Sequence, residues 1–204
     1  MGGETAWRSK NGYEATGMAA ELPGVIGIDT NCFIYFLDDH RGPRAGWLEA
    51  HVFEPLVAQR RRAVTSTLSI SELLVRPYAE KRPDRAAALR HALESLPGLS
   101  ILAVTAEIAD VAARLRSGSG LRLPDAIQLA TARAGGAEAF LTNDRSLAGA
   151  DAPLPVLVLD ELVGTGLVTR TEVREGTLSF EMDLLHARGL SSRRGHRGCA
   201  PPAL

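Results

Sequence analysis

The chain is poor in the features that mark several large classes of protein. Its 204 residues include only two cysteines, Cys32 within an apolar run and Cys199 near the C-terminal end. Two such cysteines give neither a disulfide framework nor a Cys/His zinc motif. No apolar stretch approaches the roughly 20 residues that cross a bilayer, and the first residues lack the basic-then-apolar pattern of a signal peptide. These absences predict a cytoplasmic protein without a membrane partner.

The sequence also lacks an excess of one charge and the common catalytic motifs. With 23 basic and 24 acidic residues the formal net charge is −1, so no global positive field indicates a nucleic-acid coat protein. A nuclease stays possible, because an acidic site can cancel a basic rim. The phosphate-binding loops GxxxxGK[ST] and GxGxxG do not occur, nor does the serine-hydrolase motif GxSxG. His51 and His91 lie in helical patterns and are predicted to be surface or half-buried residues rather than general bases.

Strand-like and helix-like patterns alternate along the middle of the chain. The expected strands are residues 25–29, 63–66, 100–105, 137–142 and 155–163. The expected helices are residues 31–39, 44–62, 68–78 with a break at Pro77, 84–96, 106–120 and 125–137. This alternation predicts an α/β fold: a three-layer domain over residues 24–163, with a central parallel sheet flanked by helices. Residues 1–23 are expected to be a flexible N-terminal extension, and residues 164–204 a largely irregular or disordered C-terminal extension.

Four carboxylates lie at the ends of apolar runs. They are Asp29 in VIGIDTNCFIYFL, Glu72 in TSTLSISELLV, Asp125 in LRLPDAIQLATA and Asp144 in AFLTNDRSLAG. In an open α/β sheet the carboxyl ends of the strands converge on the crevice where ligands bind. Carboxylates gathered there repel one another, so a hard cation such as Mg²⁺ or Mn²⁺ is their natural counter-charge. The pattern predicts a metal-dependent hydrolase with an all-carboxylate site.

Each acid also has a purely structural interpretation. Asp29 is suited to cap a helix N-terminus, and Asp144 to a turn between a strand and a helix. Glu72 lies three residues after Ser69, as in a capping box, although a helix that begins a few residues earlier would put Glu72 in its second turn. Asp125 is favoured in a first helical turn by the helix dipole. Taken together the four favour a shared site, because the same placement recurs around one sheet.

The order and spacing of these motifs resemble the PIN-domain ribonucleases, especially the VapC-type toxins of toxin–antitoxin pairs. The matching segments are IDTNCFI, ISELLV, LRLPDAIQLATA and LTNDRSL, and the resemblance covers nearly all of residues 24–163. It implies that Asp29, Glu72, Asp125 and Asp144 are the catalytic acids and bind one or two Mg²⁺ or Mn²⁺ ions. It further implies that neighbouring polar side chains support them, namely Thr30, Asn31, Thr142 and Asn143.

The resemblance implies a metal-dependent endoribonuclease that hydrolyses RNA phosphodiester bonds, the toxin of a type II pair inhibited by a cognate antitoxin. Two alternatives are a non-toxin PIN nuclease, acting in RNA processing or on flap DNA, and a PIN-like binding module without catalysis. Arg76, Arg82 and Arg122 are candidates to hold the RNA backbone. The apolar helical faces Trp47–Val57 and Ile70–Leu74 predict an exposed groove for an antitoxin segment or for a second copy in a homodimer.

Overall fold

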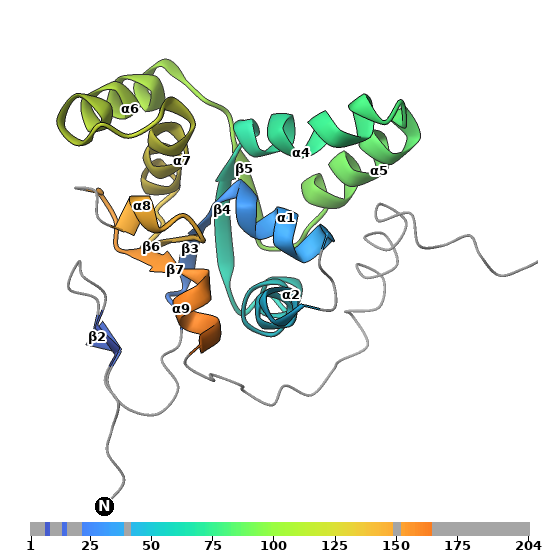
Figure 1. Ribbon diagram of the computed structural model, residues 1–204, viewed down its shortest axis with the longest axis horizontal. Helices are drawn as coiled ribbons and strands as arrows, with labels where there is room; N and C mark the ends of the chain where they lie inside the picture. The colour runs from blue at the N-terminus through green and yellow to red at the C-terminus, as the bar shows by residue number, and fades with distance from the viewer. Residues whose placement is uncertain (1–6, 9–13, 16–21, 39–41, 149–151, 165–204) are drawn as a thin grey trace, which may run out of the picture.

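The computed structural model describes residues 7–8, 14–15, 22–38, 42–148 and 152–164. At its centre is a five-stranded sheet of order β5-β4-β3-β6-β7 (Figure 1), and each pairing in it is parallel. The strands are β3 (Val25–Ile28), β4 (Arg62–Ser66), β5 (Leu99–Leu102), β6 (Ala139–Thr142) and β7 (Val156–Val158). Apolar strands that are covered on both faces favour such a sheet.

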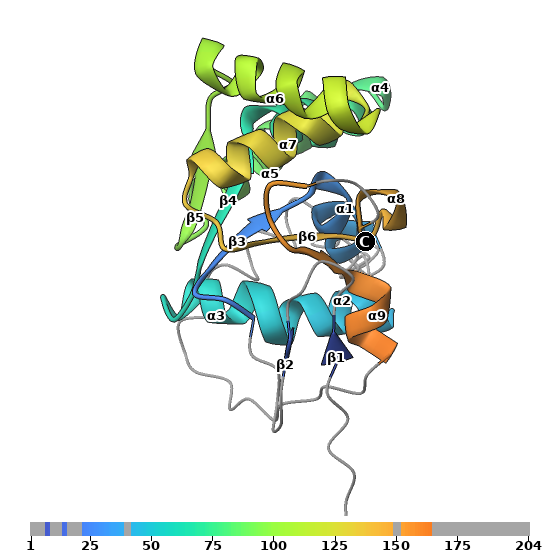
Figure 2. The same ribbon diagram turned by 90° about the vertical axis from the view of Figure 1, so that its left-hand side faces the viewer.

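Helices cover the sheet on both faces, which gives three layers (Figures 1 and 2). One outer layer consists of α6 (Ala106–Ser119) and α7 (Leu123–Ala134). The other contains α1 (Thr30–Asp38), α2 (Pro43–Leu48), the π-helical turn η1 (Glu49–Phe53), α3 (Glu54–Val57) and α9 (Leu159–Gly164). Helices α4 (Thr67–Ala79) and α5 (Pro83–Glu94) pack against each other beside α1, and the short α8 (Arg145–Ala148) follows β6. The predicted fold class is confirmed.

Side chains that alternate along the strands point to opposite faces of the sheet and pack into two separate hydrophobic cores. Ile28 and Leu141 pack in the core on the α1 side, whereas Phe140 packs in the core beneath α6 and α7. On this second face β3 carries Gly27, and a Cβ atom there would lie 2.5 Å from the Cβ of Ala132 in α7. The absence of a side chain at position 27 therefore lets α7 approach the sheet closely.

The predicted helix over 44–62 ends earlier, at Val57. The chain turns with Gln59 at a positive φ of 53°, because it must reverse before β4. The prediction that Trp47–Val57 presents a spare apolar face is wrong: Trp47, Leu48 and Val52 are buried in the α1-side core. The segment covers one face of the five-stranded sheet, so its buried apolar side chains cannot line an exposed groove.

Two further boundaries differ from expectation. Pro77 does not break α4, which continues to Ala79, because a proline in the last turn removes only one late helical hydrogen bond. The segment 155–163 is not one strand, since β7 ends at Val158 and α9 follows. Asp160 and Glu161 lie in the first turn of α9, where acids are favoured by the helix dipole.

Within the expected N-terminal extension, two-residue strands β1 (Trp7–Arg8) and β2 (Glu14–Ala15) pair antiparallel. The rest of residues 1–21 lies outside the described residues, as do residues 165–204 of the expected C-terminal extension. None of the helices in the described part of the chain is long and apolar enough to span a membrane.

Candidate active site

The predicted acids come from elements that meet at the carboxyl edge of the sheet. Asp29 directly follows β3, and Asp144 follows the neighbouring strand β6. The chain leaves β3 toward β4 and β5 and returns on the other side at β6. The edge between β3 and β6 is thus the point where the strand order reverses, at which open α/β sheets bind ligands.

The other two acids lie on helices. Asp125 is in the first turn of α7. Helix α4 begins at Thr67, directly after β4, and its N-cap is Ser66, whose side chain accepts a hydrogen bond from the Leu68 N–H. Glu72 therefore lies in the second turn of α4 and is not a capping-box residue.

The Asp29 carboxylate is held by two side-chain donors. Its Oδ2 accepts from the Thr142 hydroxyl at 2.6 Å and from the Asn31 amide at 2.7 Å. The Asn31 amide nitrogen also lies 2.9 Å from Thr142 Oγ1. These contacts fasten the carboxylate after β3 to the end of β6.

The charge on Asp29 is unfavourable within the protein itself. Burial raises the pKa of Asp29 to about 6, even though hydrogen bonds from the Thr142 hydroxyl and the Thr30 N–H oppose the rise. The negative charges of Asp125 and Glu72 raise it further. A carboxylate with this environment is stabilised by a nearby cation.

Glu72 is exposed, but its carboxylate is hydrogen-bonded to a buried network of polar side chains. The Thr30 hydroxyl donates to Glu72 Oε2 and lies 2.9 Å from the Ser69 hydroxyl. The Gln128 amide donates to Thr30 Oγ1 at 3.0 Å and to Ser69 Oγ at 2.8 Å, and Thr65 Oγ1 lies 2.7 Å from Ser69 Oγ. The network joins α1, β4, α4 and α7.

Sequence reasoning missed Thr65, Ser69 and Gln128 as members of this network. The available signal was a polar residue inside an apolar segment, such as the glutamine in AIQLATA. The large majority of buried polar side-chain atoms have at least one hydrogen-bond partner.

Asp125 and Asp144 complete the acidic group, which we define as Asp29, Glu72, Asp125 and Asp144. Burial raises the pKa of Asp125, followed by the charge of Asp144; Arg122 opposes the rise and Glu72 adds to it. The backbone N–H of Asp144 donates to Thr142 Oγ1 at 3.0 Å, and its Oδ1 accepts from the Ser146 N–H at 2.8 Å. Each of the four acids therefore lies within electrostatic range of at least one other.

This donor set suits a hard divalent cation. It consists of carboxylate oxygens, which Mg²⁺ and Mn²⁺ prefer as ligands, and its members repel one another. In their present positions no three acids, histidines or cysteines of the described residues are close enough to share one metal ion. Repulsion between like charges disfavours a closer arrangement of these carboxylates.

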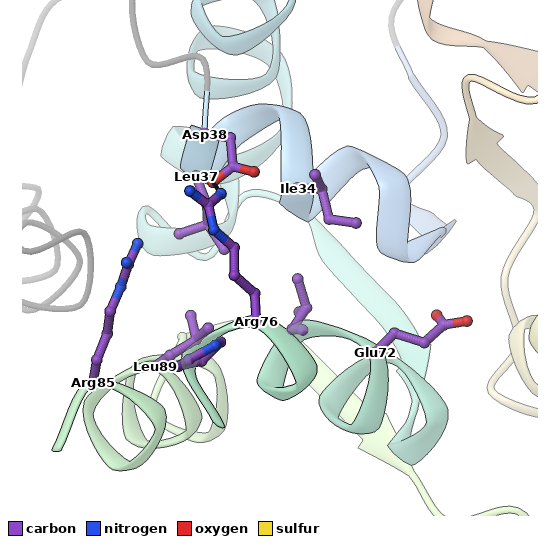
Figure 3. A pocket seen from close by; sticks show the side chains of 9 residues that line it. Ile34, Leu37, Asp38, Glu72, Arg76, Arg85 and Leu89 are labelled. Carbon is purple, nitrogen blue, oxygen red and sulfur yellow. Dashed lines mark hydrogen bonds and ion pairs between the residues drawn. The ribbon is translucent and has the colours of Figure 1, made fainter. Parts of the chain in front are cut away.

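A pocket between α1, α4 and α5 lies beside Glu72 (Figure 3). Leu73, from the face Ile70–Leu74 that was expected to be spare, both lines this pocket and belongs to the core. Arg76 reaches across the pocket to Asp38 at 2.8 Å and also pairs with Glu80 at 2.9 Å. Two acidic partners thus already engage this arginine.

The other two arginines that were candidates for RNA contacts differ in their surroundings. Arg82 pairs with Asp84 at 2.9 Å in the turn that leads into α5. Arg122 immediately precedes α7, and its charge lowers the pKa of Asp125. Arg122 is therefore the arginine of the three that acts electrostatically on the acidic group.

We expect Asp29 to make the metal-free protein less stable as the pH rises from about 4 to about 6. The pKa is 3.8 in the unfolded chain and about 6 in the folded protein, so the folded state binds more protons between these values and the free energy of unfolding falls. The shift corresponds to roughly 3 kcal/mol at most. Urea unfolding of the wild type and of Asp29→Asn across this pH range isolates the effect. Parallel pH profiles for the two proteins would contradict it.

Comparison with known proteins places the chain in a family. The model of the PIN domain matches residues 26–153. A search of curated proteins finds no match. Among solved structures, "Crystal structure of VapBC2 from Rickettsia felis bound to a DNA fragment from their promoter" is 19% identical, covers 66% of this chain and 98% of that chain, and gives a TM-score of 0.50. This likeness supports the fold.

Two other solved structures give similar values. A "Toxin-antitoxin complex from Klebsiella pneumoniae" is 25% identical over 67% of this chain and 98% of that chain, with a TM-score of 0.49. FitAcB from Neisseria gonorrhoeae is 21% identical over 66% of this chain and 97% of that chain, also with a TM-score of 0.49. The family-model match covers well over half of the sequence, and the chain belongs to the PIN domain family.

Proposed function

We propose that this protein is a metal-dependent endoribonuclease that hydrolyses phosphodiester bonds of RNA. One observation carries the proposal: in a PIN domain, four carboxylates lie around the switch point of a parallel sheet, each within electrostatic range of at least one other. PIN domains are generally nucleases, and they typically use divalent metal ions. Asp29, Glu72, Asp125 and Asp144 are the proposed ligands.

The chain's own residues prepare the site for this chemistry. Mg²⁺ or Mn²⁺, when bound, lowers the pKa of water and neutralises charge on the phosphate. Asp29 has a pKa of about 6, so it is mostly ionised near pH 7 and ready to bind a cation. Thr142 and Asn31 orient its carboxylate, and Thr30 orients that of Glu72.

The substrate would be bound by basic groups at the rim of the acidic site. Arg122 is exposed and lies within electrostatic range of Asp125. A guanidinium there would bind a phosphate of the RNA backbone. Single-stranded segments are the proposed target, because their bases and backbone are free of helical structure.

We further propose that the nuclease is the toxin of a type II pair, inhibited by a cognate antitoxin. Support comes from the motifs IDTN, ISELLV, LRLPDA and LTNDRSL, which resemble those of VapC-type toxins. A homodimer belongs to the same proposal. The apolar surface available for it includes Ile34 and Val75, which are 41% and 64% exposed.

The two alternatives, a non-toxin PIN nuclease and a PIN-like binding module, can be distinguished from the toxin. A short open reading frame directly upstream that encodes an antitoxin favours the toxin over an RNA-processing PIN nuclease. A PIN-like binding module would not require four carboxylates that destabilise one another. Calorimetry that detects no Mn²⁺ binding would favour this binding module over the nuclease.

The proposed activity is tested by incubating the purified full chain with a fluorescent single-stranded RNA. Denaturation and refolding first remove any bound partner. We expect cleavage with Mg²⁺ or Mn²⁺, none with EDTA, and full recovery when excess metal is returned. Intact RNA at every metal concentration, from protein whose circular dichroism shows the native fold, would overturn the proposal.

A further inference from the structure

A cluster of four side chains lies outside the acidic group and connects to it. Arg44 of α2 makes a two-pronged ion pair with Asp160 of α9, with Nε–Oδ1 at 2.6 Å and Nη2–Oδ2 at 3.1 Å. The Arg44 guanidinium also lies over the Tyr35 ring of α1, 4.7 Å from its centre. Helices α2 and α9 lie side by side in both views (Figures 1 and 2). We call Arg44, Tyr35, Asp160 and Asn143 the Arg44 clamp.

Asn143 connects this clamp to the acids. Its side-chain amide donates to the Tyr35 hydroxyl at 3.3 Å, and its Oδ1 accepts from the Asp160 backbone N–H at 2.9 Å. Its backbone N–H donates to Asn31 Oδ1 at 3.1 Å. The Asn31 amide in turn donates to the Asp29 carboxylate at 2.7 Å. Asn143 is also the residue directly before Asp144.

The geometry of the clamp exceeds what an ordinary surface ion pair provides. Both prongs of the Arg44 guanidinium are aligned with one carboxylate, which fixes its orientation as well as its distance. Stacking on the Tyr35 ring further restricts the position of the Arg44 guanidinium. The clamp therefore brings together α1, α2, α9 and the loop after β6, and the residue at their meeting point is Asn143.

We propose that Arg44 and Tyr35 are positioning residues, which hold Asn143 and thereby the loop that carries Asp144. The inference rests on the proposed nuclease function, because it assigns these residues a role in that same site. Tyr35 contacts Asn143 through its hydroxyl. Arg44 reaches Asn143 through Asp160, whose backbone N–H donates to the Asn143 side chain. Loss of a partner that is hydrogen-bonded to a metal ligand typically costs about 10- to 100-fold in activity or metal affinity. Arg44 and Tyr35 act through Asn143 and Asn31, so we expect a loss at the lower end of this range.

The test combines a structural readout with a kinetic one. The variants are Arg44→Gln, which removes the ion pair, and Tyr35→Phe, which removes only the hydroxyl that accepts from Asn143. Arg44→Lys keeps the charge without the two-pronged geometry. Arg90→Gln breaks an ion pair to Glu94 on α5 and is the matched control for Arg44. The exposed Tyr78→Phe is the matched control for Tyr35.

Hydrogen exchange of the Asn143 side-chain amide, followed by NMR in metal-free protein, reports on position without any need for activity. We expect faster exchange in Arg44→Gln and Tyr35→Phe, an intermediate rate in Arg44→Lys, and wild-type rates in both controls. In RNA cleavage we expect kcat per folded molecule to fall about 10-fold or more in Arg44→Gln, with less change in KM. Arg44→Lys should recover part of this loss.

The outcomes separate the clamp from the nuclease proposal. An Asn143 amide that exchanges at the wild-type rate in Arg44→Gln and Tyr35→Phe overturns the clamp. So does a loosened amide with unchanged kcat, or a lower melting temperature as the sole effect. If the wild type cleaves no RNA, the proposed function fails, and the exchange measurement still decides whether Arg44 and Tyr35 position Asn143.

Discussion

Replacement of Asp29 by asparagine is expected to lower the rate of RNA cleavage at least about 1,000-fold at saturating Mn²⁺. The substitution keeps the size of the side chain and removes the charge that would bind the cation. Stabilisation of transition-state charge by a metal ion is worth several kcal/mol, and about 4 kcal/mol corresponds to three powers of ten in rate. Single-turnover cleavage of a labelled RNA measures the loss directly.

The same substitution should leave the fold intact. Asparagine Oδ1 can accept the hydrogen bonds that Thr142 and Asn31 now donate to Asp29. Because burial disfavours the charged form of Asp29, the variant should melt a few degrees higher than the wild type at pH 7 without metal. Added Mn²⁺ should reverse that order, since it stabilises only the protein that binds it. Asp110→Asn, an exposed acid of α6, is the control, and wild-type cleavage by Asp29→Asn would remove Asp29 from the site.

Glu72→Gln and Asp125→Asn are each expected to reduce cleavage at least about 100-fold, equivalent to roughly 2.7 kcal/mol of activation free energy. Glu72 and Asp125 lie on helices α4 and α7 rather than at strand ends, and would contribute their carboxylates to a cation from there. Both residues raise the pKa of Asp29 through their charges, so they share one electrostatic environment with it. The double variant should lose little more than either single variant, because groups that act as a unit are not additive.

Glu107→Gln provides the matched control for Asp125→Asn, because Glu107 is likewise an acid in a first helical turn, that of α6. It should retain wild-type cleavage. Calorimetric titration with Mn²⁺ should show weaker binding in Glu72→Gln and Asp125→Asn. Full activity in both, or losses that simply multiply in the double variant, would contradict a single metal-binding unit.

The local sequence predicted much of the fold because hydrophobic periodicity is a property of neighbouring residues. Alternating apolar runs and helical patterns placed strands within two or three residues of β3, β4 and β6. The same reasoning failed where distant segments decide the outcome. Trp47 was expected on an exposed apolar face, but that face packs against the sheet and Trp47 is buried. The DELV segment was expected in a strand, but it forms a helix whose Asp160 N–H is bound by Asn143.

The sequence by itself determined the parallel α/β architecture and the four acids at the ends of its apolar runs. In parallel strands the carboxyl ends meet at one edge, so the acids that follow two neighbouring strands, Asp29 and Asp144, are already predicted to lie near each other. Only the tertiary structure decided the strength of that site. Asp29 owes its raised pKa to burial and to the charges of Asp125 and Glu72. Its carboxylate is oriented by Thr142, which is 113 residues away. The Arg44–Asp160 pair spans 116 residues. Such contacts leave no periodic trace, because they depend on how separate elements pack rather than on the preferences of either element.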